Sequence, residues 1–253
     1  MVSLYPLSQS AKFVFYFNVV FTTLWACCFI RFLILLVLVG KRFLPGGIAD
    51  FFHVVSLAPL ISFFYVKGLI QRKFSLRDAW SLGNAIRMVW ICYGVIYPSP
   101  KIAKHTSYSY LILSWCMLGL IHYGYYSFKV KTGGSPRWLF WLKYHHFFVT
   151  FPLGFVSEMI LTFLSLAYVD DGLIFEILLK TQLLSYVPLG YLTWVYLAHT
   201  KMEKYNNIIR KKQERRPREE QNENIASSVS GYGDNYQLSD MSSQQTNRAQ
   251  SQH

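Results

Sequence analysis

The chain has 253 residues, of which 53% are hydrophobic and 18% aromatic, a larger apolar share than the about 45–50% that is usual in soluble domains. Only 15% of the residues are charged, yet the formal net charge is +12. An apolar chain with a basic excess is typical of a membrane protein with cationic loops, which argues against a soluble domain and against a nucleic-acid-binding protein. The four cysteines all lie in apolar runs and form no C-x-x-C pair, so neither a zinc site nor a disulfide framework is predicted.

Six apolar runs are long enough to cross a bilayer as helices, which takes about 20 residues each. In chain order they cover residues 13–39, 51–70, 79–97, 108–128, 138–167 and 174–199. Turn signals separate them, among them Pro45-Gly46-Gly47 and Asp170-Asp171-Gly172. Only helices or closed barrels satisfy the backbone in lipid, and runs this long are helices. The predicted fold class is therefore all-α, a polytopic membrane protein with six transmembrane helices.

The lysines and arginines predict how these spans are oriented. Six spans place both termini on one side of the membrane. The connections on that side are rich in cations, namely Arg72, Lys73, Arg77, Lys129, Lys131 and Arg137. The opposite connections carry fewer cations, namely Lys41, Arg42, Lys101 and Lys104. Because cytoplasmic loops carry the excess of lysine and arginine, both termini are predicted to be cytoplasmic.

The composition changes near Asn206, where glutamine, asparagine, serine, arginine and glutamate replace the apolar residues. We therefore predict two regions, a transmembrane domain over residues 1–205 and a cytoplasmic tail over residues 206–253. The first part of the tail is basic and can extend the last span as a charged helix until Pro217. The part beyond about Asn222 cannot bury a core and is predicted to be disordered.

Four ionisable side chains stand out within the predicted spans, namely Arg31, Arg87, His122 and Glu158. Such groups are expensive in hydrocarbon and usually face a partner or a cavity. Glu158 has two interpretations at this point. It is either a structural partner of Arg87 or Arg31, or a carboxylate that transfers protons in a reaction. The two overlap, because a paired arginine would also tune a catalytic acid.

The histidines do not predict a metal site. His145 and His146 are neighbours, and adjacent helix positions point about 100° apart, so the two cannot easily share one metal ion. The other histidines are isolated, namely His53, His105, His122, His199 and His253. The chain also has no P-loop and no G-x-S-x-G elbow. We therefore predict neither a metal nor a cofactor.

One stretch carries a specific motif, "RWLFWLKYHHFFVTFPLGFVSEMILTF" over residues 137–163. It resembles the signature of the very-long-chain 3-hydroxyacyl-CoA dehydratases, also called the protein-tyrosine-phosphatase-like family, whose pattern is roughly R-Y-x-x-F-x-x-x-Y-P-x-G-x-x-S-E. The residues that match are Tyr144, Phe147, Pro152, Gly154, Ser157 and Glu158. Arg87 and Trp115 also stand where the family has an arginine and a tryptophan, and weaker similarity covers most of residues 10–205.

The resemblance implies a multi-pass protein of the endoplasmic reticulum membrane that acts in the third step of fatty-acid elongation. That step removes water from a long or very long 3-hydroxyacyl-CoA and gives a trans-2-enoyl-CoA. The implied partners are the acyl-CoA substrate, membrane lipids and other elongation enzymes, with no nucleic acid. The resemblance also implies Glu158 as a catalytic residue. The implied substrate-binding or supporting residues are Arg87, Lys143, Tyr144, Gly154 and Ser157.

The chain departs from the family at the second catalytic position. The family pairs a tyrosine with a glutamate seven residues later, and seven residues turn about 700°, so both point from one helix face. Here the glutamate is Glu158 but the tyrosine position is Phe151. Dehydration needs a base for the α-proton and an acid for the departing hydroxyl, and phenylalanine can be neither. Three further departures are Lys143 for arginine, and Gly119 and His122 for the glutamate and arginine of the fourth span.

Three functions follow as hypotheses. The first is a dehydratase of this family, with low activity that Phe151→Tyr would raise. The second is a catalytically impaired relative that binds acyl-CoA or elongation enzymes as a scaffold or regulator. The third is a small transporter gated by Glu158 and Arg87, which the lack of inverted repeats disfavours.

Overall fold

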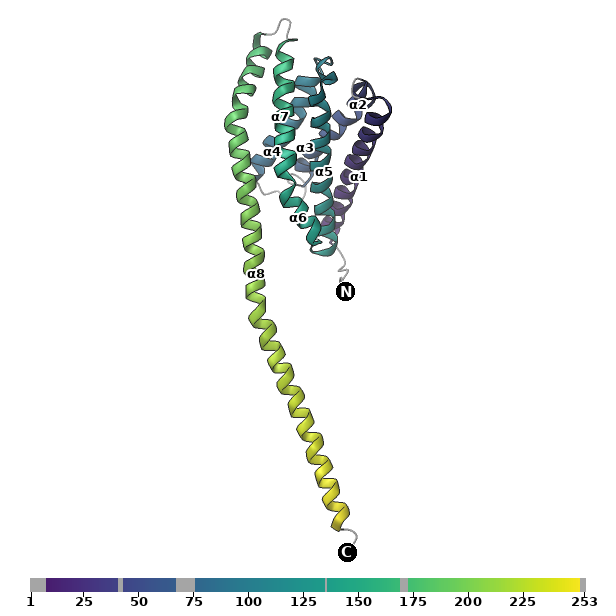
Figure 1. Ribbon diagram of the computed structural model, residues 1–253, viewed down its shortest axis with the longest axis vertical. Coiled ribbons are helices and arrows are strands. Elements are labelled where there is room, and N and C mark those ends of the chain that lie inside the picture. The colour runs from purple at the N-terminus through teal and green to yellow at the C-terminus, as the bar shows by residue number, and fades with distance from the viewer. Residues whose placement is uncertain (1–7, 41–42, 67–75, 135, 169–172, 251–253) are drawn as a thin grey trace. The chain divides into compact units, whose positions relative to one another are not determined.

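The computed structural model of the chain (Figure 1) describes residues 8–40, 43–66, 76–134, 136–168 and 173–250, and all regular elements in those ranges are helices. The chain separates into two units, Met1–Trp194 and Val195–His253. The first unit contains the candidate site. The second contains only the continuation of the last helix, α8 (Leu173–Gln250).

The first helix, α1 (Gln9–Leu38), contains nearly all of the first predicted span and begins where Ser8 accepts a hydrogen bond from the backbone N–H of Ala11. Its buried side chains are Asn18, Trp25, Cys28 and Phe32, which are spaced by three, four or seven residues. This spacing places them on one stripe of the helix. That stripe packs mainly on α5 (Thr106–Thr132).

The second predicted span is two helices, α2 (Leu44–Ser56) and α3 (Ala58–Phe63). The predicted turn at Pro45-Gly46-Gly47 is wrong, because these residues form the first turn of α2. Proline is favoured there, since its missing N–H would have no helical partner in the first turn anyway. The same effect separates the two helices, because Pro59 lies in the first turn of α3, which begins at Ala58 directly after Leu57.

The third and fourth predicted spans are both helical. The third is α4 (Leu76–Val89) followed without a gap by a π-helix, η2 (Trp90–Ile96). A short 3₁₀ helix, η3 (Ile102–Lys104), leads to α5, which ends at Gly133 in a left-handed conformation with φ 66°. π-Helical turns are frequent at functional sites, and this one begins at Trp90.

The fifth predicted span is also two helices, α6 (Arg137–His145) and α7 (Phe147–Leu166). Proline commonly breaks or kinks a helix, yet α7 continues through Pro152 and the break lies at His146. Pro152 removes one backbone hydrogen bond from α7, which the packing of that helix on α5 tolerates.

Four described helical segments are long and apolar enough to cross a membrane, namely Gln9–Leu38, Leu44–Val66, Arg137–Leu166 and Leu173–Arg210. The all-α membrane class is therefore confirmed, while the predicted six spans are not. The two that do not qualify are residues 79–97 and 108–128. They are less apolar, because residues 79–97 include Asn84 and Arg87 and residues 108–128 bury Ser109, Ser114 and Ser127. A helix enclosed by other helices can be this polar, since its side chains need not face lipid.

Two other predictions concern loops and the tail. The predicted orientation depends partly on Lys41, Arg42, Arg72 and Lys73, which lie outside the described residues. The predicted turn at Asp170-Asp171-Gly172 also lies outside them. The tail beyond Asn222 is predicted to be disordered, whereas α8 continues as a helix to Gln250. Helix propagation adds one hydrogen bond per residue, and the start of the tail is rich in glutamate, glutamine, lysine and arginine, which favour helix.

Candidate functional site

Glu158 is the centre of a polar cluster in the first unit. Its side chain is only 1% exposed, and it lies on α7. It forms an ion pair with Arg87 of α4, whose guanidinium Nη1 donates to Oε2. Trp115 of α5 donates its indole N–H to Oε1 at 3.2 Å, and Tyr186 of α8 donates its hydroxyl to Oε2 at 3.3 Å. A buried carboxylate requires such partners, because an unpaired charge away from water is very costly.

The cluster continues from Tyr186 to two further side chains. The side-chain amide of Gln182 donates to the Tyr186 hydroxyl at 3.0 Å. The indole N–H of Trp90, at the start of the π-helix, donates to the carbonyl oxygen of Gln182 at 2.6 Å. The cluster therefore joins side chains from α4, η2, α5, α7 and α8.

Sequence reasoning missed Tyr186 and Gln182. A signal for them exists, because they are two polar residues four positions apart within the last apolar run and thus share one helix face. Their proximity to Glu158 depends on how α8 packs, which periodicity alone does not give. By contrast, the structure brings together Arg87, Trp115 and Glu158, which the family motif singled out.

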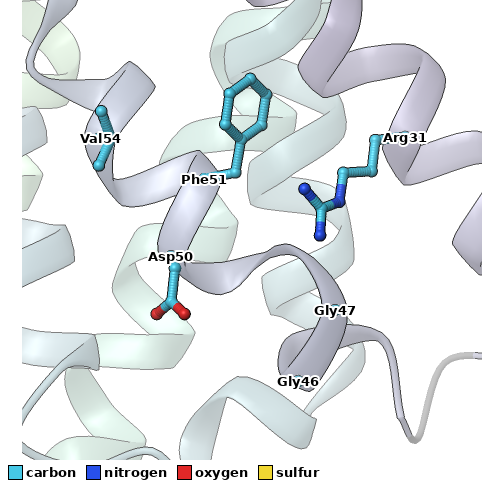
Figure 2. Close-up of a pocket in the computed structure, with 6 residues that line it drawn as sticks. All are labelled: Arg31, Gly46, Gly47, Asp50, Phe51 and Val54. Carbon is cyan, nitrogen blue, oxygen red and sulfur yellow. The ribbon is translucent and has the colours of Figure 1, made fainter.

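Arg31, the other arginine considered as a partner of Glu158, lies in a different part of the molecule. It lines a cavity of about 340 Å³ together with Gly46, Gly47, Asp50, Phe51 and Val54. Its guanidinium lies 5.9 Å from the centre of the Phe51 ring. Figure 2 shows Arg31 reaching from α1 toward Phe51, with Asp50 pointing away from it. The structure thus selects Arg87 as the cation that pairs with Glu158.

Phe151 lies among aromatic rings. Its half-buried ring stacks on Phe155 with centroids 5.3 Å apart, and Trp194 lies 6.1 Å away. The Phe155 ring in turn contacts Tyr186 edge to face at 5.1 Å. Phe151 therefore supports the wall next to the cluster without supplying a hydroxyl.

Gly154 and Ser157 are two other residues of the motif, and Gly154 lies where two helices meet. A Cβ at Gly154 would lie 2.6 Å from the hydroxyl oxygen of Ser114, so a glycine is needed for α5 and α7 to approach this closely. Ser114 donates to the carbonyl of Thr150 at 2.6 Å across the same interface. Ser157 donates to Leu153 of its own helix. Neither residue is bonded to Glu158.

Lys143 and Tyr144 lie on α6, and both contact side chains of α5. The Lys143 ammonium is 2.9 Å from Nδ1 of His122 and lies over the rings of Tyr125 and Tyr126. The Tyr144 ring lies 6.4 Å from that of Tyr125. The structure therefore places these two predicted supporting residues in a second cluster, apart from the bonds that Glu158 makes.

Gly119, where the family offers a glutamate, packs against α1. A Cβ there would lie 2.5 Å from the indole of Trp25, which is fully buried. The space that a longer side chain would need is thus filled by tryptophan.

Among the residues that the structure describes, no three histidine, cysteine, aspartate or glutamate side chains gather as metal ligands would.

Comparisons with known proteins agree with the motif. The family model described as protein tyrosine phosphatase-like protein, PTPLA, matches residues 82–215, which include Arg87, Trp115, Glu158 and Tyr186. Very-long-chain (3R)-3-hydroxyacyl-CoA dehydratase PASTICCINO 2 of Arabidopsis thaliana is 27% identical over 117 residues, which is 46% of this chain and 52% of that protein. The chain thus spans about half the length of this relative.

Two fungal proteins match over longer stretches. A probable very-long-chain (3R)-3-hydroxyacyl-CoA dehydratase of Schizosaccharomyces pombe is 28% identical over 62% of this chain and 66% of its own length. The β-1,6-glucan synthesis-associated protein KEG1 of Saccharomyces cerevisiae is 32% identical over 68% of this chain and 88% of its own length. No solved structure matches the chain. Since the family model covers more than half of the residues, including those that surround Glu158, the chain is a member of the protein tyrosine phosphatase-like family, PTPLA.

Proposed function

We propose that this protein dehydrates long or very long 3-hydroxyacyl-CoA to trans-2-enoyl-CoA in fatty-acid elongation. Relatives from plants and Schizosaccharomyces pombe are named as such dehydratases. The substrate is an acyl-CoA in a membrane, which suits a chain with four apolar helices of spanning length. The net charge of +12 also suits an anionic CoA substrate.

The observation that carries the proposal is the buried Glu158 with its ion pair and hydroxyl partner. Dehydration removes a proton from C2 and a hydroxyl from C3, so it needs a base and an acid close together. A carboxylate shielded from water and held by fixed donors suits the first role. Arg87 is then the supporting cation that pairs with Glu158.

The remaining site residues have supporting roles in this proposal. Gly154 lets α7 approach α5 closely, Ser157 bonds within α7, and Lys143 and Tyr144 form the second cluster with α5. We assign to Lys143 an attraction for the phosphate groups of CoA. Phe151 keeps the shape of the family's tyrosine without its chemistry.

The proposal extends to location and organisation. The protein would lie in the endoplasmic reticulum membrane with both termini in the cytoplasm, in keeping with the distribution of lysine and arginine. Residues 1–205 would form the catalytic membrane domain and residues 206–253 a cytoplasmic tail. Other elongation enzymes would be its partners.

The experiment is turnover of a 3-hydroxyacyl-CoA by the purified full-length protein, with formation of trans-2-enoyl-CoA as the readout. We expect turnover by the wild type and loss of at least about 100-fold in Glu158→Gln, because the amide cannot take a proton. Glutamine keeps the size of the side chain, but its single carbonyl oxygen can replace only one of the two carboxylate oxygens that Trp115 and Tyr186 contact, so the melting temperature of the variant is measured alongside its turnover. A folded wild type that makes no enoyl-CoA would refute the proposal.

A second candidate function rests on the match to KEG1, which covers 88% of that protein. In this alternative the chain serves β-1,6-glucan synthesis and needs no dehydration, in keeping with Phe151. Cells that depend on this chain would lose β-1,6-glucan from the wall when it is removed. Equal rescue of wall glucan by the wild type and Glu158→Gln would support this role, and unchanged glucan after removal would refute it.

A further inference from the structure

The direction of each hydrogen bond in the cluster can be read from its donors. An indole N–H only donates, so the atom of Gln182 that faces Trp90, 2.6 Å away, is the carbonyl oxygen. The amide nitrogen of Gln182 must then face Tyr186, where it donates to the phenol oxygen at 3.0 Å. That oxygen accepts from Gln182, which leaves its own proton to point at Glu158, 3.3 Å away.

Tyr186 therefore presents a proton to the carboxylate while its oxygen is held by an amide donor. Its side chain is only 3% exposed and its ring is fixed against Phe155. No other hydroxyl of the described residues is bonded to Glu158, whose partners are Arg87, Trp115 and Tyr186. Ser157, the nearest hydroxyl in sequence, is bonded to Leu153 instead.

We propose that Tyr186, from the last span, supplies the phenol that position 151 lacks and acts as the acid in the dehydration. This inference rests on the proposed dehydratase function. Tyr186 and Phe151 both contact the ring of Phe155, so a hydroxyl from either position would reach the same region of the site.

The reaction balances with these two groups. Glu158 takes the proton from C2, the electron pair of that bond forms the C2=C3 double bond, and the C3–O bond breaks. The departing hydroxyl takes the proton of Tyr186 and leaves as water. Tyr186 is then a phenolate and Glu158 a carboxylic acid, so the proton returns from Glu158 to Tyr186 across their contact and both groups are restored.

The neighbours of Tyr186 suit this cycle. The phenolate formed on proton donation is negative, and the Gln182 amide already donates to that oxygen. Donors that are in place before charge develops lower the barrier most effectively. The hydrogen bond from Trp90 holds the Gln182 amide with its nitrogen toward the phenol oxygen. Trp90 and Gln182 are therefore positioning residues.

The test is Tyr186→Phe in the full-length protein, assayed with 3-hydroxyacyl-CoA. We expect a loss of roughly 10²–10⁴-fold in turnover, the range for removal of one proton-transfer group. The control is Tyr191→Phe, which removes the same hydroxyl from a side chain that is 70% exposed on the same helix. It should leave turnover and melting temperature unchanged.

A rescue separates a chemical role from a structural one. In the Tyr186→Phe background, Phe151→Tyr should raise turnover at least tenfold above that of Tyr186→Phe alone, because it returns a phenol from α7. In the wild-type background the same change should alter turnover by less than about threefold, since the phenol is already present. A purely structural role for Tyr186 predicts no rescue, and that result would overturn the inference.

The remaining outcomes are also decisive. If the wild type turns over substrate and Tyr186→Phe keeps at least a third of that turnover, Tyr186 is not the acid, while the dehydratase function stands. If the folded wild type is inactive, the dehydratase function itself fails. If Tyr186→Phe does not fold, Gln182→Met replaces it as the test. A turnover loss of tenfold or more with the fold intact supports the inference, and a smaller loss overturns it.

Discussion

Glu158 accepts hydrogen bonds from three donors that belong to three other helices, and one of them carries a positive charge. The same bonds tie α4, α5, α7 and α8 together, so the residue serves both the fold and the proposed chemistry. Removal of a single partner should therefore lower stability as well as activity.

Arg87→Met tests the structural half of that statement. The change leaves Glu158 buried with two neutral donors and no cation. Breaking a buried pair typically costs about 3–5 kcal/mol, and since Arg87 is 30% exposed we expect about 1–3 kcal/mol here. Thermal unfolding in detergent, followed by circular dichroism, would measure the loss.

The matched control is Arg210→Met, which breaks the ion pair of Arg210 with Glu214 on α8. Both of these side chains are well exposed, and such surface pairs contribute at most about 0.5 kcal/mol. Equal melting temperatures for the two variants would mean that the Arg87–Glu158 pair does not hold the helices together.

At the scale of elements, small residues determine how closely the helices of the first unit approach. Gly154 lies against Ser114 at the contact of α5 and α7, and Gly119 lies against Trp25 at the contact of α5 and α1. A third glycine, Gly190, lies against Phe155 where α8 meets α7. Helices in membranes commonly use small residues in this way, because van der Waals packing replaces the hydrophobic effect there.

Gly154→Ala should be destabilising because its Cβ would lie 2.6 Å from the Ser114 hydroxyl. We expect a cost of about 1–3 kcal/mol, as for other overpacked interiors, and a decrease in turnover as α7 shifts. Gly83→Ala on α4 is the control, since nothing lies within 4 Å of its Cβ, and it should be neutral or slightly stabilising. An unchanged melting temperature in Gly154→Ala would show that the two helices have room to separate.

The comparison of sequence with structure also belongs to the elements. Apolar length alone predicted that each of the six runs is helical, because a bilayer leaves the backbone no other choice in a long run. It did not predict that residues 79–97 and 108–128 are too polar for a stand-alone span. Nor did it locate the break at His146, since Pro152 gave the stronger local signal.

The site was predictable where a motif identified it. Glu158, Arg87 and Trp115 are recognisable in sequence and lie together. Tyr186 and Gln182 come from a helix with no part in the quoted motif, and only tertiary packing brings them to Glu158. Tertiary packing also decides the surroundings of Lys143 and Tyr144. Both are within the motif, but they contact Tyr125 and are not among the side chains bonded to Glu158.

At the scale of the whole molecule, we expect the basic residues to orient the chain in the membrane. We expect both termini in the cytoplasm, since the tail after the last span contains a run of lysine and arginine. Glycosylation-acceptor tags fused to either end should therefore remain unmodified in cells. A tag in the connection between the third and fourth predicted spans, near Lys101, is the positive control and should be glycosylated. A glycosylated C-terminal tag would reverse this orientation.

The central claim is that Glu158 exchanges a proton with C2 of an acyl-CoA. The direct measurement is deuterium at C2 when the purified full-length protein runs the reaction backwards, from trans-2-enoyl-CoA in heavy water. The wild type should place one deuterium at C2 of the 3-hydroxyacyl-CoA product, and folded Glu158→Gln should place none. Equal incorporation by the two proteins, or none by a folded wild type, would contradict the account.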